Sequence, residues 1–432
     1  MRKKGIVVLL VLLCTVAVFA SGQKDVDSKE AGSEPVKLLI HNSDASMEKS
    51  LAFIMDHIDE ECPGVEIELE MVTGSAEDYE TKVRTLIAGG NAPDVWWDHG
   101  GTWATPILKA EAALALDPYL DDSDFWDNVV PSAKLPHTDG HIYAIPFENM
   151  FYEVMFYNTE IFEELGLEVP VTADELVEVV KTVKDAGLTP IAVAGKDGWP
   201  AAMMMEGFAY TIDGEVTKNI VESGKKFADS SYVEAAHFMK ELIEMGAFSP
   251  NVSLTDYGTA LNLFESGKAA MMANGSWTLG GTFKNMSGAC DYFYYPALHE
   301  ADAADLGKAV AGGAKKNSGI FVSSETKDPE TAVQVAIAVG KLQSRYYYEI
   351  NGDLAVPFIP EKFQWESTVE IPAPIQRLGN DMANFEHVYG LVQDVMPTAA
   401  GTTAVIQGAS GFMTGNMTVD ELISSLDRAL EQ

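Results

Sequence analysis

The chain has 432 residues, of which 47% are hydrophobic and 22% charged, values typical of a folded protein long enough for two domains or more. It carries 29 basic and 65 acidic residues, a formal net charge of −36 at pH 7. Such an acidic surface repels nucleic acids and anionic membranes, and we exclude both as partners.

The first residues have the features of a secretory signal. Basic residues precede the apolar run 5–17, and a small residue, Ala20, stands at the expected cleavage point. We therefore expect a signal peptide at 1–20, which is too short for a retained membrane span. Residues 21–35 are polar, charged and free of aromatic residues, so we expect them to form a disordered tether.

The cysteines do not form the pattern of a disulfide framework. Cys14 lies within the expected signal, which leaves Cys62 and Cys290 far apart in the sequence. The sequence leaves their pairing open, and we favour two buried thiols.

From residue 36 onward, apolar segments with the period of a strand alternate with segments that have the period of a helix. The periodicity predicts strands at 36–41, 65–71, 94–98, 190–194 and 269–273, and helices around 47–58, 79–87, 172–187, 233–245, 257–265, 332–342 and 418–430. Strands separated by helices indicate a parallel α/β sheet with right-handed crossovers.

Polar, glycine and tryptophan residues follow several of these predicted strands. The segments concerned are 41–44, 98–101, 195–199 and 274–277. Because ligands bind beyond the carboxyl ends of strands in open α/β sheets, we expect these loops to line one cleft. Tryptophan faces stack on pyranose C–H groups while short polar side chains bond hydroxyls, so Trp97, Trp199 and Trp277 are predicted to contact a sugar. We expect Trp126 and Trp365 to pack in the core instead.

Enzyme motifs are absent or incomplete. Gly267-Lys268 lacks the glycine and the hydroxyl of a phosphate-binding loop, and 408–411 lacks the spacing of a nucleophile elbow. His137 and His141 are separated by a glycine-containing turn, which spoils a helical metal face. We therefore expect no catalytic residue, no metal site and no cofactor. A secreted glycoside-active enzyme with a carboxylate pair stays open as an alternative.

Several short motifs occur in a characteristic order along the chain. They are 91–95 (NAPDV), 116–120 (LDPYL), 140–146 (GHIYAIP), 156–162 (FYNTEIF), 264–271 (FESGKAAM), 275–277 (GSW) and 312–320 (GGAKKNSGI). In this order and spacing the chain resembles the extracellular solute-binding proteins of carbohydrate-type ABC importers, which include the maltose-binding type.

The resemblance implies an α/β fold of two lobes, the type II periplasmic-binding-protein fold, with parallel or mixed sheets, flanking helices and a hinge. The N-terminal lobe would comprise 36–145 plus 311–345, and the C-terminal lobe 146–310 plus 346–432. The chain would cross between the lobes near 143–148 and again near 295–311.

The resemblance also nominates ligand-binding residues. Trp277 matches the position that stacks on a sugar, and Glu148 matches an acidic sugar contact. Further candidates from the resemblance are Trp97, Asp98, His99, Tyr152, Trp199 and Gly313, and the strand-end loop 41–44 adds Asn42 and Ser43.

The function implied is that of a periplasmic substrate-binding component of an ABC importer. It would capture a sugar or oligosaccharide by hinge closure, act as a monomer, and deliver the solute to a membrane permease. Position 21 is Ser, whereas many relatives carry a lipid-attached cysteine there, so we favour a free periplasmic protein over a lipoprotein. A polyamine or other cationic solute, and a sensor in place of the permease, stay open. The sequence does not identify the sugar.

Overall fold

The computed structural model describes residues 34–42, 45–74, 76–101, 103–121, 123–137, 139–313, 318–382 and 384–431. The predicted signal peptide, nearly all of the predicted tether and the candidate Ser43 lie outside the described residues.

The strands of the described residues are short, and most of them are buried. They are β1 (Val36–Asn42), β2 (Ile67–Thr73), β3 (Val95–Asp98), β4 (Ala144–Ile145), β5 (Phe151–Asn158), β6 (Thr189–Ala192), β7 (Ala269–Gly275), β8 (Cys290–Phe293), β9 (Ala309–Gly313), β10 (Gly319–Val322) and β11 (His387–Tyr389).

Helices connect these strands and flank them. They are α1 (Ala45–Glu61), α2 (Ala76–Ala88), α3 (Ala104–Lys109), α4 (Asp117–Leu120), α5 (Thr159–Leu165), α6 (Ala173–Asp185), α7 (Trp199–Tyr210), α8 (Val216–Ser223), α9 (Tyr232–Met245), α10 (Tyr257–Glu265), α11 (Leu279–Asn285), α12 (Pro329–Asn351), α13 (Pro360–Phe363), α14 (Ala373–Met382), α15 (Val392–Val395), α16 (Ala399–Phe412) and α17 (Val419–Leu430).

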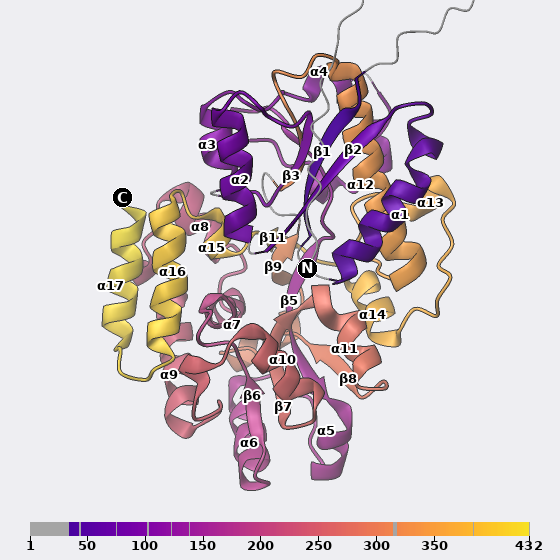
Figure 1. Ribbon diagram of the computed structural model, residues 1–432. Coiled ribbons are helices and arrows are strands. Elements are labelled where there is room, and N and C mark those ends of the chain that lie inside the picture. The colour runs from indigo at the N-terminus through magenta and orange to yellow at the C-terminus, as the bar shows by residue number, and fades with distance from the viewer. Residues whose placement is uncertain are drawn as a thin grey trace, which may run out of the picture. The chain divides into compact units, whose positions relative to one another are not determined.

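The first sheet has the strand order β2-β1-β3-β10-β4 (Figure 1). Strand β1 pairs in parallel with β2 and β3, as the alternation of strands and helices predicts, because each crossover helix returns the chain in the same direction. Strand β10 joins antiparallel to β3 and β4, which makes the sheet mixed. Helices α1 and α12 pack against each other beside this sheet.

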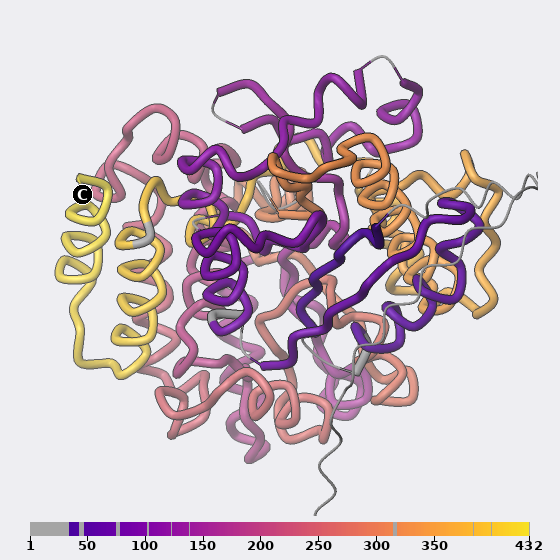
Figure 2. Tube along the Cα trace, turned by 45° about the horizontal axis from the view of Figure 1, so that its top comes forward, coloured from indigo at the N-terminus to yellow at the C-terminus, as the bar shows by residue number. Residues whose placement is uncertain are grey.

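The second sheet has the order β11-β9-β5-β7-β6, and β8 also pairs with β5. Helices α7 and α9 contribute buried side chains to its core, and α16 and α17 lie side by side near the C-terminus (Figures 1 and 2). With two mixed sheets and flanking helices, the predicted α/β fold class is confirmed.

Capping residues in the sequence explain where α6 and α17 begin. At the start of α6, Thr172 Oγ1 accepts a hydrogen bond from Glu175 N at 3.3 Å, and the Glu175 carboxylate accepts one from Thr172 N at 3.2 Å. This is the predicted capping box, which satisfies donors that a helix leaves unpaired. Thr418 and Glu421 begin α17 in the same way.

The chain passes between the two sheets at three points. Residues 146–150 connect β4 of the first sheet to β5 of the second. The second passage lies between Gly313 in β9 and Gly319 in β10. The extra strand β9 keeps 309–313 in the second sheet because it pairs with β5 and β11.

The chain returns to the second sheet between Trp365 and Ile375. Phe358 and Trp365 still pack against the core of the first sheet, and Ile375 in α14 packs in a cluster with residues of β5 and β7. The aromatic contact of Phe358 with Phe125, 5.8 Å between ring centroids, holds this late segment on the first sheet.

Cys62 and Cys290 are both buried and free, so the favoured prediction of two separate thiols is confirmed. Burial raises the pKa of the Cys62 thiol to about 11, which keeps this thiol protonated and unreactive.

A carboxyl group, Glu206, is fully buried in α7. It accepts hydrogen bonds from Thr217 Oγ1 at 2.5 Å and from Val392 N at 3.0 Å. Burial nevertheless dominates and raises the pKa of Glu206 to about 8 from an ordinary 4.5. Between these two values the folded protein holds a proton that the unfolded chain has released, so the free energy of unfolding falls as pH rises.

The substitution Glu206→Gln should remove this dependence, because an amide does not titrate. We expect the free energy of unfolding of the parent protein to fall by up to roughly 1 kcal/mol per pH unit across this window, and that of the variant to change less. Urea denaturation between about pH 5 and pH 8 measures both slopes. The exposed Glu241→Gln is the control, and equal slopes in Glu206→Gln and the parent would contradict the prediction.

Candidate functional site

A cleft of about 1280 Å³ is lined by residues from both sheets and their helices. From the first-sheet side it is lined by Met47, Trp97, Trp126, Gln343 and Tyr347, and from the second-sheet side by Phe151, Tyr257, Trp277, Thr282 and Lys284. The lining thus combines large aromatic surfaces with a few polar side chains, a composition typical of small-molecule sites.

Trp277 is the most exposed of the tryptophans that line this cleft, with 38% of its surface accessible. It lies in a short 3₁₀ turn (Ser276–Thr278) directly after β7. The preceding Asn274 is fully buried, and its Oδ1 accepts hydrogen bonds from Gly275 N and from Tyr257 OH, both at 3.0 Å. Its Nδ2 donates to Thr278 Oγ1 at 3.1 Å, so one side chain fixes the turn on both sides of the ring.

The two residues between Asn274 and Trp277 each have a steric or hydrogen-bonding role. A Cβ at Gly275 would lie 1.9 Å from Cζ3 of Trp277, so only glycine leaves room for the ring. Ser276 Oγ accepts a hydrogen bond from Tyr152 N at 3.0 Å, which ties the turn to β5. The sequence Asn-Gly-Ser-Trp therefore holds an exposed indole in one position.

Trp277 belongs to a group of rings that we call the aromatic platform: Phe151, Trp199, Tyr257 and Trp277. Trp277 Nε1 donates a hydrogen bond to Tyr257 OH at 2.9 Å, and the ring centroids of Trp199 and Trp277 are 5.9 Å apart. Trp199 also contacts Tyr257 at 5.1 Å, and Phe151 meets Trp277 edge-on at 6.0 Å. Trp199 supports Trp277 but does not itself line the cleft.

Three residues that line the first-sheet side of the cleft have a buried polar atom without a partner among the described residues. The buried Nε1 atoms of Trp97 and Trp126 and Oε1 of Gln343 make no hydrogen bond there. The Trp97 ring, in β3, is only 3% exposed and contacts Phe147 at 5.2 Å. Unpaired buried polar atoms are costly, so this wall is complementary to a ligand with several hydrogen-bonding groups.

Trp126 lies both at the edge of the first-sheet core and in the cleft lining. We expected it to pack in the core with Trp365, and Trp365 does pack against the first-sheet core and stacks on Phe363 at 4.8 Å. Trp126 packs there in part but also lines the cleft, because it lies in a 3₁₀ turn (Phe125–Asn128). That turn belongs to an irregular segment in which no periodicity marks which side chains face the cleft.

The segments that pass between the sheets supply further polar groups to the cleft. Glu148 accepts a hydrogen bond from Ser318 Oγ, and Asn149 Nδ2 donates one to Asp353 Oδ2 at 2.6 Å. Asp353 also accepts from Ala355 N at 2.9 Å, and burial raises its pKa above the ordinary value. All of these side chains belong to segments joining secondary-structure elements, where sequence periodicity gives no signal, and only Glu148 was nominated, through its motif.

Asp98 and His99 were predicted to contact the ligand, yet neither lines the cleft. Asp98 is fully buried, and its Oδ1 accepts a hydrogen bond from Gly100 N at 2.8 Å. His99 Nδ1 lies 2.6 Å from the buried carboxylate of Glu80, and its Nε2 lies 3.0 Å from Nδ1 of His41. These bonds shape the loop after β3 and hold the Trp97 strand end in place.

The other predicted residues also lie away from the cleft lining. Tyr152 is 4% exposed and contacts Phe385 at 4.9 Å, Asn42 ends β1 half-buried, and Gly313 ends β9. Of the candidates nominated from sequence, the structure brings Trp97, Glu148 and Trp277 together in the lining. The sequence did not nominate Trp126, Asn149, Tyr257, Thr282, Gln343 or Asp353.

The arrangement is suited to holding a ligand that has both flat apolar faces and many hydroxyl groups. Among the described residues, no group of three or more His, Cys, Asp or Glu side chains could hold a metal ion. In the same part of the chain, no helix has both the length and the apolar character needed to cross a membrane.

Comparisons with known proteins agree with this geometry. A family profile described as bacterial extracellular solute-binding protein matches residues 44–338. The multiple sugar-binding protein of Streptococcus mutans is 24% identical over 390 residues, which are 81% of this chain and 81% of that protein. The maltotriose-binding protein of Pyrococcus abyssi is 29% identical over 223 residues, 51% of this chain and 44% of that protein.

Solved structures show the same fold. A structure from a study of xylan utilization by Caldanaerobius polysaccharolyticus has a TM-score of 0.78 and 22% identity, covering 91% of this chain and 99% of that one. A chitin oligosaccharide binding protein has a TM-score of 0.74 and 22% identity, covering 92% of this chain and 98% of that one.

The turn geometry predicts the effect of Gly275→Ala. The added methyl group must displace the Trp277 ring, which would cost roughly 1–3 kcal/mol of stability. With 5-fluorotryptophan incorporated, the ¹⁹F resonance of Trp277, assigned from its absence in Trp277→Phe, should shift. Gly281→Ala is the control, because a Cβ there meets nothing within 4 Å. An unmoved Trp277 resonance in Gly275→Ala would show that the glycine does not position the ring.

Proposed function

Because this chain belongs to the family of bacterial extracellular solute-binding proteins, we propose that it is the substrate-binding component of an ABC importer and captures a sugar or oligosaccharide in the cleft. The observation that carries this proposal is the pairing of the aromatic platform with the unpartnered polar atoms of the opposite wall. The sugar-binding names of the relatives support the same solute class.

Binding would use the two walls in different ways. A sugar ring lies against the exposed face of Trp277, where its C–H groups replace water on the indole. Its hydroxyl groups accept from Trp97 Nε1 and Trp126 Nε1 and donate to Gln343 Oε1, which satisfies these buried atoms. The cleft volume of about 1280 Å³ leaves room for more than one sugar ring.

Solute capture would proceed by lobe closure. We place residues 36–145 and 318–365 in the first lobe and 151–313 and 373–431 in the second, a division supported by sheet membership and core packing. A sugar that contacts both walls has a higher affinity for the closed form and shifts the equilibrium toward it.

The extracellular family is consistent with export, and the basic and apolar start of the chain supports a signal peptide at 1–20. We propose a free, monomeric periplasmic protein that delivers its solute to a membrane permease. A role in binding rather than catalysis fits the engagement of Glu148 by Ser318 and of Asp353 by Asn149 and Ala355 N.

The substitution Trp277→Ala should weaken sugar binding without unfolding the protein. Loss of the stacking face should cost about 1–3 kcal/mol of binding free energy, because the indole is exposed before the solute arrives. A thermal-shift screen of mono- and oligosaccharides identifies the solute, and calorimetry then compares the variant with the parent. Trp103→Ala, outside the cleft lining, is the control, and an unchanged Kd in Trp277→Ala would remove this residue from the site.

The salt dependence of binding separates a neutral sugar from a cationic solute. The affinity for a neutral sugar should change little when NaCl is raised from about 0.05 M to about 0.5 M, since no charge pair is formed. Binding of a polyamine would instead weaken steeply, because its charges would be screened from the acidic surface. Calorimetry at the two salt concentrations measures the difference.

A further inference from the structure

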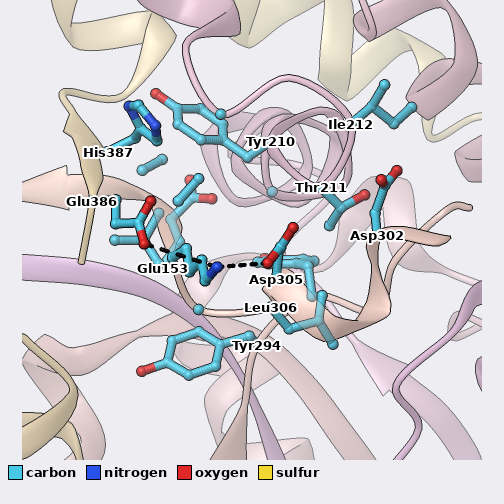
Figure 3. Close-up of a pocket in the computed structure, with 18 residues that line it drawn as sticks. Glu153, Tyr210, Thr211, Ile212, Tyr294, Asp302, Asp305, Leu306, Glu386 and His387 are labelled. Atoms are coloured by element: carbon cyan, nitrogen blue, oxygen red, sulfur yellow. Dashed lines mark hydrogen bonds and ion pairs between the residues drawn. The ribbon is translucent and has the colours of Figure 1, made fainter. Parts of the chain in front are cut away.

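A second, smaller cavity of about 230 Å³ lies away from the cleft and shares no lining residue with it. It is bordered by β5, the C-terminal end of α7, the segment after β8, the approach to β9 and the start of β11. Figure 3 shows the labelled acids Glu153, Asp302, Asp305 and Glu386, with the rings of Tyr210 and Tyr294, around this cavity.

Buried oxygen atoms without partners line the inner end of the cavity. Glu153 is 2% exposed, and neither oxygen of its carboxyl group has a hydrogen-bond partner among the described residues. The hydroxyl groups of Tyr210 and Tyr295 are also buried and without a partner in that part of the chain. Burying a carboxyl group without a hydrogen bond lowers the stability of the folded protein, unless a ligand supplies a hydrogen-bond donor.

The charges around the cavity favour a cation. Asp302, Asp305 and Glu386 line it together with Glu153, against a single lysine, Lys308, in the described lining. Lys308 Nζ lies 2.6 Å from Asp305 Oδ1 and 3.8 Å from Glu386 Oε1, and its side chain is 48% exposed. This lysine is engaged by Asp305 and Glu386, and Glu153 has no ion-pair partner among the described residues of the lining.

We propose that this cavity binds a small organic cation with N–H donors, an alkylammonium or guanidinium ion, whose charged group meets the Glu153 carboxylate. Two N–H groups can pair with the two carboxylate oxygens, and the tyrosine rings provide cation–π surface. A metal ion is the poorer occupant, because the described residues offer no group of three His, Cys, Asp or Glu ligands. At roughly 30 Å³ for one water molecule, the volume suits a ligand of only a few non-hydrogen atoms.

The protonation of Glu153 is coupled to this binding. Burial, followed by the nearby Glu206, raises the pKa of Glu153 well above its ordinary value. A bound cation favours the ionised carboxylate, so binding releases a proton. The other titratable groups around the cavity are Tyr210, Tyr294, Tyr295, Asp302, Asp305, Lys308, Glu386 and His387.

Glu153 lies on β5, which pairs with β7, the strand that precedes the Trp277 turn. Glu153 on β5 is the register partner of Gly275 on β7, two residues before Trp277. Binding at Glu153 is nevertheless independent of the sugar site, and it does not require that the cleft binds sugar.

Calorimetry with methylguanidinium and butylammonium chlorides tests the proposal, in about 150 mM NaCl to screen weak surface attraction. We expect saturable binding of at least one of these ions. Tetramethylammonium, which has no N–H donor, and neutral methylurea should not bind. Glu153→Gln should weaken binding at least about tenfold, because an amide lacks the charge, while Glu241→Gln should leave it unchanged.

Two further measurements keep the outcome decisive. Thermal denaturation checks that Glu153→Gln folds, as expected for removal of a buried charge. Titration of the parent protein in two buffers of different ionisation enthalpy measures the proton release and does not depend on the variant. Absence of saturable binding, equal affinity in a folded Glu153→Gln, or binding without proton release would overturn the proposal and indicate a cavity filled by water.

Discussion

The contact of Glu148 with Ser318 joins the two segments by which the chain first leaves the first sheet and later returns to it. The hydrogen bond between Asn149 and Asp353 ties a third segment to the same place. All of these residues line the cleft, so the connections between the sheets are fastened where a solute would bind. These polar contacts, together with the hydrogen bond from Met150 N to Ala355 O at 2.7 Å, join the segments between the Trp97 wall and the Trp277 wall.

The aromatic platform shows how an exposed tryptophan can be held still. Burial usually positions a tryptophan ring, but Trp277 is partly exposed and is positioned by hydrogen bonds instead. Asn274 fixes the turn, and Tyr257 accepts a hydrogen bond from the indole nitrogen. Gly275 allows the ring to lie over the backbone. Because the ring is held before binding, little conformational entropy is lost when a solute stacks on it.

The sequence predicted the alternation of strands and helices well because burial of apolar faces has a fixed period in each. It predicted Trp97, Glu148 and Trp277 as site residues because they follow strand ends or a recognisable motif. It missed Gln343, on the far part of a longer helix than expected, and Trp126, in an irregular segment. It assigned Asp98 and His99 to the ligand, whereas Glu80 and Gly100 engage them, a tertiary pairing that no local pattern encodes. The pairing of β9 with β5 and the contact of Phe358 with Phe125 are likewise tertiary features that no local pattern encodes.

A crystal structure of the protein with the saccharide that gives the largest thermal shift tests the central claim most directly. We expect one sugar ring to lie against the Trp277 indole, with hydroxyl groups of the same molecule within hydrogen-bond distance of Trp97 Nε1 or Trp126 Nε1 across the cleft. A saccharide bound outside the cleft, or one that contacts residues of only one sheet, would contradict it.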